Sequence, residues 1–144
     1  MAKLYFIYSS MNAGKSTVLL QASYNYVERG MNTLLMTAAV DDRAGIGRIS
    51  SRIGLTAEAD IFQLDDDLYE HIRRAHDARP VDAVFVDEAQ FLSEAQVWQL
   101  AQAADRLGMP VMCFGLRTDF QGQLFPGSKA LLALADSLKE IKTI

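Results

Sequence analysis

One short segment combines the residue types that bind the phosphate groups of a nucleotide: Ser9, Ser10, Met11, Asn12, Ala13, Gly14, Lys15, Ser16 and Thr17. It follows an apolar run at residues 4–8 and precedes a stretch that can form a helix. A tight turn at a helix N-terminus would point backbone N–H groups at the phosphates, Lys15 would approach the β- and γ-phosphates, and the Ser16 hydroxyl would bind Mg²⁺. The segment therefore predicts a phosphate-binding loop, although Ser9 stands where the usual pattern has glycine.

Two carboxylates, Asp87 and Glu88, end the apolar run at residues 83–86. In a parallel sheet, ligands bind beyond the carboxyl ends of the strands, so we expect this pair to face the phosphate-binding loop. Asp87 is then the candidate for holding Mg²⁺, directly or through water. Glu88 has two candidate roles that the motif does not separate. It could orient a water for hydrolysis, or accept a proton from a substrate hydroxyl during phosphate transfer.

Further candidates lie in the connections between the expected elements. Arg43 belongs to an irregular segment, residues 41–58, that is rich in glycine and charge, and loops of this length are often functional. An arginine there could stabilise the transferred phosphoryl group, or it could simply be exposed. Phe91, Phe120 and Phe125 follow strand ends, where each could stack on a base or cap the core.

Strand and helix signals alternate along the chain. Short apolar runs predict strands at residues 3–8, 33–37, 83–86 and 111–114, and the periodic stretches between them predict helices that begin at Lys15, Asp67 and Ser93. A last helix is predicted with Leu131, Leu134, Ala135 and Leu138 on one face, followed by a strand from Ile141. This order predicts an α/β fold with a mostly parallel β-sheet flanked by helices on both faces. Together with the phosphate-binding loop, it is typical of a P-loop NTPase fold, RecA-like in class.

Length and composition restrict the class of protein. A chain of 144 residues, half of them hydrophobic, is expected to form one domain with one core. The net charge of −4 and the isoelectric point of about 5.1 argue against a nucleic-acid partner, which would need a basic surface. No apolar run predicts a membrane span or a signal peptide. The single Cys113 lies in an apolar run and is expected to be a buried thiol, and one cysteine excludes an internal disulfide. Together these features favour a reducing compartment, so we expect a cytoplasmic protein.

The motifs taken together resemble those of the cytosolic, zinc-containing thymidine kinases, and the match is close to the bacterial members. The resemblance covers essentially the whole chain, and bacterial members often carry serine at the position of Ser9. The motifs that carry it are Met11 within the phosphate-binding loop, Asp41-Asp42-Arg43, Asp87-Glu88-Ala89-Gln90-Phe91, Gly115-Leu116-Arg117-Thr118-Asp119-Phe120 and Phe125-Pro126-Gly127-Ser128.

The resemblance implies transfer of the γ-phosphoryl group of ATP to the 5′-hydroxyl of thymidine or deoxyuridine, in nucleotide salvage for DNA synthesis. It implies Glu88 as the base, Lys15, Ser16 and Asp87 as the phosphate and Mg²⁺ set, and Arg43 at the phosphates. It also groups Gln90 with the residues that bind the cofactor. The nucleoside pocket that it implies consists of Met11, Phe91, Leu116, Phe120 and Phe125.

In the family, a cysteine-rich zinc module and a flexible lasso follow the last strand and close over the thymine. Residues 1–144 are therefore expected to form the P-loop nucleoside-kinase core, with the zinc ligands and the lasso absent from this sequence. By themselves these residues are expected to bind ATP and Mg²⁺ but to phosphorylate thymidine poorly. The resemblance further implies a homotetramer.

Two other functions compete with the kinase. The run from Asp87 to Gln90 also looks like a helicase-type acidic box, which would suit a nucleic-acid-stimulated ATPase. One core and an acidic isoelectric point weigh against that function. A non-catalytic nucleotide-binding module is the second alternative, and the intact set of Lys15, Asp87 and Glu88 weighs against it.

Overall fold

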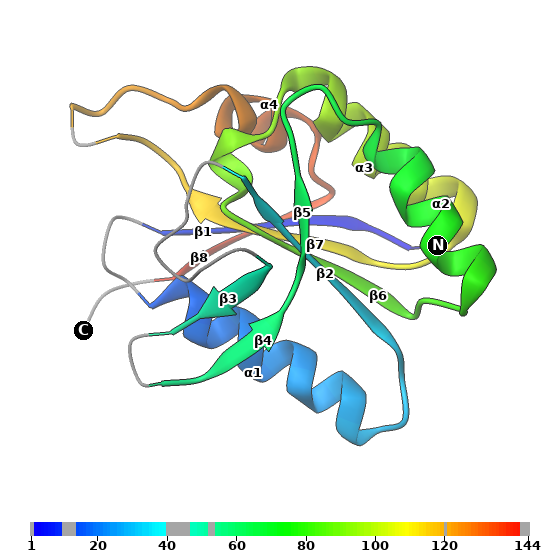
Figure 1. Ribbon diagram of the computed structural model, residues 1–144. Helices are drawn as coiled ribbons and strands as arrows, with labels where there is room; N and C mark the ends of the chain where they lie inside the picture. Colours follow the sequence, from blue (N-terminus) through cyan, green and yellow to red (C-terminus); the bar gives the residue numbers. More distant parts are fainter. Residues whose placement is uncertain (1, 10–13, 40–46, 52–53, 120, 142–144) are drawn as a thin grey trace.

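A computed structural model describes residues 2–9, 14–39, 47–51, 54–119 and 121–141 of the chain. Within these residues a six-stranded sheet lies between two layers of helices (Figure 1). The strands are β1 (Leu4–Ser9), β2 (Thr33–Ala38), β3 (Arg48–Ser50), β4 (Thr56–Glu58), β5 (Asp60–Phe62), β6 (Ala83–Asp87), β7 (Val111–Leu116) and β8 (Ser137–Ile141). The helices are α1 (Lys15–Glu28), α2 (Leu68–Ala78), the 3₁₀ turn η1 (Ala89–Phe91), α3 (Glu94–Leu107) and α4 (Pro126–Leu134).

The main sheet has the strand order β5-β2-β6-β7-β1-β8, and all of its pairs are parallel. The strand that carries Asp87, β6, is separated from β1 by a single strand, β7. Because the strands are parallel, their carboxyl ends meet at one edge of the sheet. Ser9, Asp87 and Leu116 are the last residues of β1, β6 and β7, so this edge gathers the predicted site.

Alternate residues along each central strand enter the two halves of the core. Val84 and Val86 of β6 pack in the cluster that also contains buried residues of α2, α3 and α4. Ala83 and Phe85 pack in the opposite cluster with Leu19 of α1. Side chains of a strand point alternately to its two faces, so Asp87 follows Phe85 toward the layer of α1. The predicted α/β fold with helices on both faces is thus confirmed (Figure 1).

The helix starts follow from local capping. The Asp67 side chain accepts a hydrogen bond from the Glu70 N–H at 3.1 Å, which satisfies a donor of the first turn of α2. Ser93 and Gln96 form a reciprocal capping box at the start of α3. Both starts agree with the sequence prediction. Cys113 is fully buried, as expected, and burial raises the pKa of its thiol.

Two expectations were wrong. The segment at 41–58, expected to be irregular, contains β3 and β4, which pair as an antiparallel hairpin, and β5 follows at the edge of the main sheet. The last helix ends at Leu134, and Leu138 lies instead in β8, which pairs with β1. In each case the local pattern was too short to reveal which neighbour the segment meets. Within the described residues, the helices are too short or too polar to cross a membrane.

Candidate active site

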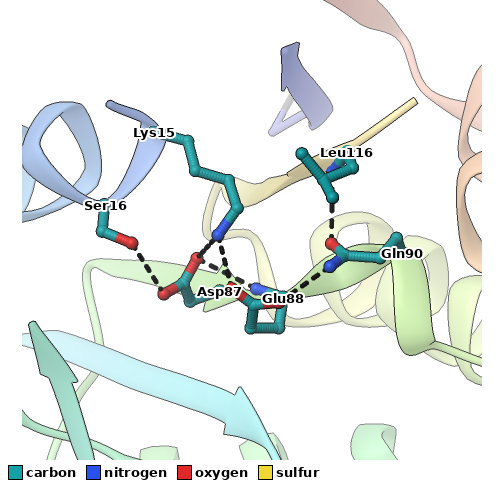
Figure 2. A network of polar contacts seen from close by, with 6 residues as sticks. All are labelled: Lys15, Ser16, Asp87, Glu88, Gln90 and Leu116. Carbon is teal, nitrogen blue, oxygen red and sulfur yellow. Dashed lines mark hydrogen bonds and ion pairs between the residues drawn. The ribbon is translucent and has the colours of Figure 1, made fainter. Parts of the chain in front are cut away.

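Lys15 joins the two acidic residues that end β6. Its Nζ lies 3.0 Å from Asp87 Oδ1 and 2.6 Å from Glu88 Oε1 (Figure 2). Ser16 Oγ donates to the other Asp87 oxygen at 3.2 Å. Thus the first turn of α1 and the end of β6, more than 70 residues apart in sequence, form one polar cluster.

The start of α1 suits an anion. Gly14 precedes the helix with φ of 77°, a conformation that glycine adopts without a steric penalty. No side chain among the described residues caps the first turn of α1. Its N–H groups and the positive end of the helix dipole are therefore available to phosphate oxygens. Ser9 is buried at the end of β1, and its Oγ has no partner in the described part of the chain.

The charge of Lys15 is set by two opposing effects. Burial by itself lowers the pKa of this ammonium group, but the Asp87 and Glu88 carboxylates and their hydrogen bonds outweigh it. The pKa of Lys15 therefore lies above its ordinary value, and the side chain is a cation at neutral pH. One partly buried ammonium group thus faces two carboxylates.

Glu88 has an unusual backbone. It is the single non-glycine residue with positive φ in the described ranges, with φ of 57° and ψ of 39°. Its N–H donates to Asp87 Oδ1 at 2.9 Å, which holds the sharp turn between β6 and η1. Residues with side chains rarely adopt this left-handed conformation, and such strain clusters at functional sites. The turn directs the Glu88 carboxylate at Lys15 while leaving it only 8% exposed.

Gln90 is the next side chain in the network. Its Nε2 donates to Glu88 Oε2 at 2.7 Å, and its Oε1 accepts from the Leu116 N–H at 3.1 Å (Figure 2). The sequence prediction grouped Gln90 with the cofactor but did not foresee these partners. The one signal in the sequence was its position two residues after Glu88, in a turn that carries the two acids.

Two of the predicted nucleoside-pocket aromatics lie together. The rings of Phe91 and Phe125 meet edge to face, with centroids 5.7 Å apart. Phe91 is 37% exposed, so part of this aromatic surface remains open to a ligand. Leu116, at the end of β7, is joined through its N–H to the buried Gln90 side chain. Leu116, a predicted member of the nucleoside pocket, is therefore joined to the network that holds Glu88.

A family model described as thymidine kinase matches residues 2–144 of the chain. The chain belongs to the thymidine kinase family. A thymidine kinase of Agrobacterium fabrum is 67% identical over 144 residues, which cover 100% of this chain and 75% of that relative. Thymidine kinases of Ruegeria pomeroyi and Jannaschia sp. are 68% and 65% identical over all of this chain, which covers 73% and 74% of their lengths.

Membership of the thymidine kinase family confirms the family that the motifs predicted and, with it, an ATP-dependent enzyme that acts on a nucleoside. It favours the kinase over the two alternatives, the nucleic-acid-stimulated ATPase and the non-catalytic module. Six predicted site residues fall outside the described residues: Ser10, Met11, Asn12, Ala13, Arg43 and Phe120.

The donor set at Ser16 and Asp87 fits Mg²⁺. A hydroxyl and a carboxylate oxygen, 3.2 Å apart, are the hard oxygen ligands that this ion prefers. Across the described ranges, no group of three or more histidine, cysteine, aspartate or glutamate residues gathers into a metal cage. Mg²⁺ usually takes one or two protein ligands and completes its shell with phosphate oxygens and water.

Proposed function

We propose that this chain transfers the γ-phosphoryl group of ATP to the 5′-hydroxyl of thymidine or deoxyuridine, with Glu88 as the base. The 5′-oxygen forms a new bond to the γ-phosphorus as the bond to the bridging oxygen breaks. ADP leaves with that electron pair, and the hydroxyl proton passes to the Glu88 carboxylate. The products are ADP and the nucleoside 5′-monophosphate.

The observation that carries this proposal is the setting of Glu88. The carboxylate is nearly buried and lies 2.6 Å from the Lys15 ammonium group, at the N-terminus of the helix that follows the phosphate-binding loop. A base must lie beside both the phosphates and the hydroxyl that attacks them. Phe91 is the last residue of η1, the 3₁₀ turn that begins directly after Glu88, and its ring meets that of Phe125. This favours proton transfer from a nucleoside over the positioning of a water.

Lys15 and the start of α1 supply positive charge for the phosphates. Charge develops on the phosphoryl oxygens during transfer, and preorganised donors stabilise it without reorganisation. We assign Lys15 to this role, together with the backbone of residues 9–17, and we place Arg43 at the same phosphates on family grounds. Ser16 and Asp87 would hold Mg²⁺, which when bound neutralises charge on the phosphate oxygens. Gln90 lies beside these residues, where its side chain contacts Glu88.

The nucleoside would be enclosed by apolar surface. Phe91, Phe125 and Leu116 are the described members of this pocket, and Met11 and Phe120 complete the set that the family resemblance implies. An aromatic pair with an exposed face can pack on a planar base, which supports this assignment.

The activity is tested by transfer of label from [γ-³²P]ATP to thymidine, using the natural full-length chain. Replacing the base by Glu88→Gln is expected to lower kcat by about 10²- to 10⁴-fold, the contribution of a positioned proton acceptor, while ATP binding stays close to normal. The matched control is Glu94→Gln, an exposed carboxylate at the start of α3, which should leave kcat unchanged.

Two outcomes would contradict the proposal. Near-normal turnover in Glu88→Gln would remove Glu88 from the role of base. ATP hydrolysis that RNA or DNA stimulates, without any transfer to thymidine, would favour the ATPase instead.

The remaining expectations also stand as proposals. Residues 1–144 would be the kinase core, and a zinc module with a lasso after residue 144 would complete the nucleoside site. The support is the family resemblance and the relatives' greater length, since this chain covers 73–75% of the three named relatives. Metal analysis of the natural full-length chain tests the zinc. The resemblance supports a homotetramer in the cytoplasm, and the mass of the particle in solution tests the assembly.

A further inference from the structure

We propose that Gln90 is a positioning residue, which holds the Glu88 carboxylate in place for proton transfer and ties it to the backbone of the nucleoside pocket. The proposal rests on the proposed function of Glu88 and deepens it. Gln90 acts through Glu88 and does not touch the reacting atoms. Four observations on the described residues carry the argument.

First, the Gln90 amide has one arrangement that satisfies both of its ends. Nε2 donates to Glu88 Oε2 at 2.7 Å, and Oε1 accepts from the Leu116 N–H at 3.1 Å (Figure 2). The reversed amide would place its oxygen against a carboxylate and its NH₂ group against an N–H donor. Both contacts would be repulsive, so the neighbours themselves fix the orientation of the amide.

Second, the Gln90 side chain is tightly enclosed by its neighbours. The side chain is only 1% exposed. A Cβ atom at Gly115 would lie 2.7 Å from Gln90 Oε1 and 2.9 Å from the Gln90 backbone nitrogen, and one at Gly127 would lie 2.9 Å from the Gln90 carbonyl oxygen. Two glycines thus let β7 and α4 approach the turn η1 closely. A side chain confined in this way holds its partner rigidly.

Third, Glu88 needs a partner that does not change during the reaction. Its Oε1 atom is paired with Lys15, and Lys15 must also serve the phosphates when ATP is bound. Its Oε2 atom is paired with Gln90, whose contacts lie within the protein. The Glu88 backbone is strained, with φ of 57°, and such a conformation persists only where surrounding contacts hold it. The position of the carboxylate therefore depends on contacts with other residues. Gln90 is therefore the constant member of the pair.

Fourth, Gln90 connects two parts of the site. Leu116, which donates to Gln90, ends β7, and its carbonyl oxygen accepts from the Ser128 hydroxyl of α4. The chain of contacts runs from α4 and the end of β7, through Gln90, to Glu88 and Lys15. Both polar atoms of the Gln90 amide are engaged in this chain. That favours a positioning role over direct contact with ATP.

The first test replaces Gln90 by methionine, which has a similar shape but no amide, in the natural full-length chain. The kcat for thymidine is expected to fall by between tenfold and about 100-fold, the scale of a catalytic group that is misplaced by an ångström. The KM for ATP should change little, because the phosphate contacts of Lys15 and α1 remain.

Gln96 provides a matched control. It is also 1% exposed, and its Nε2 donates to the carbonyl oxygens of Gln63 at 2.7 Å and Asp66 at 3.1 Å. These contacts lie away from Glu88. Gln96→Met should therefore lower the free energy of unfolding about as much as Gln90→Met does, but it should leave kcat unchanged. An equal fall of kcat in the two variants would overturn the proposal, since it would reflect a general loss of order.

A second variant guards against misfolding. Gln90→Glu keeps the size of the side chain and the acceptor for the Leu116 N–H, but it sets a carboxylate against Glu88. Like charges at this distance repel, so kcat should fall at least as far as in Gln90→Met. A kcat close to that of the unmodified protein in either variant would overturn the proposal.

The experiments distinguish the base role of Glu88 from the positioning role of Gln90. If Glu88→Gln abolishes transfer while both Gln90 variants turn over normally, the base role stands and the positioning role is overturned. If Glu88→Gln itself turns over normally, the proposed function of Glu88 fails and the positioning role fails with it.

Discussion

The turn after β6, residues 87–91, and the turn before α3, residues 93–96, are neighbours in the chain, and each buries a glutamine that is 1% exposed. In the second turn the capping bonds are local, and the distant partners of Gln96 Nε2 are the uncharged backbone carbonyl oxygens of Gln63 and Asp66. Gln96 N–H donates to Ser93 Oγ, and Ser93 N–H donates to Gln96 Oε1, both at 3.1 Å. In the first turn the partners come from far away: Lys15 from α1 for Glu88, and the end of β7 for Gln90.

The two turns also differ in backbone conformation. Ser93 is extended, with φ of −78°, whereas Glu88 is left-handed, with φ of 57°. The second turn uses its polar side chains to begin a helix, which stabilises the fold. The first combines backbone strain with two buried carboxylates and the partly buried Lys15 ammonium group, which is a poor way to gain stability. A polar turn that bonds uncharged groups thus serves folding, and a turn that sets carboxylates against a distant cation serves chemistry.

Among changes that separate the two turns, removal of the cation that pairs with the first turn is expected to have the largest effect. In Lys15→Met, the phosphates lose a charged donor, and Asp87 and Glu88 face each other without a cation between them. We expect kcat to fall by about 10²- to 10³-fold, the usual loss when one preorganised donor is removed. Steady-state kinetics with thymidine measure it. Lys3→Met, at the other end of β1, is the control, and an equal loss there would contradict the assignment.

The second turn should respond in stability alone. Ser93→Ala removes the hydroxyl that caps α3, so the free energy of unfolding should fall by about 1 kcal/mol. The kcat and KM values should stay the same, because no atom of this turn reaches the acidic pair. Urea denaturation and kinetics on one preparation measure both quantities. A lower kcat at unchanged stability would show that the two turns are not separate in function.

An effect of similar size concerns the strain at Glu88. Glu88→Ala and Glu88→Gly both remove the carboxylate, but only glycine adopts a positive φ without a steric penalty. The free energy of unfolding of the glycine variant is therefore expected to be about 1 kcal/mol higher than that of the alanine variant. Thermal or urea unfolding of the two measures the difference. An alanine variant as stable as the glycine variant would mean that the backbone relaxes and that the turn stores no strain.

The local features of the fold were predictable. The capping residues Asp67 and Ser93 marked the starts of α2 and α3, and the wholly apolar run before Asp87 marked a central strand, because each signal acts within a few residues. The end of the chain was not. Leu131, Leu134 and Leu138 kept a helical spacing, yet the helix ends at Leu134 and β8 pairs with β1. A short periodic pattern does not reveal that the segment will pair with the free edge of β1 as a strand.

By itself, the sequence determined the chemistry that the site offers: a phosphate-binding loop with Lys15, and two acids at the end of a strand. It also determined the family, through motifs in a fixed order. The tertiary structure alone decided the pairing of Lys15 with Glu88, the left-handed backbone at Glu88 and the burial of Gln90 between Glu88 and β7. These contacts join residues up to 73 positions apart. They exist because the parallel sheet brings the ends of its strands to one edge, and no local pattern encodes that arrangement.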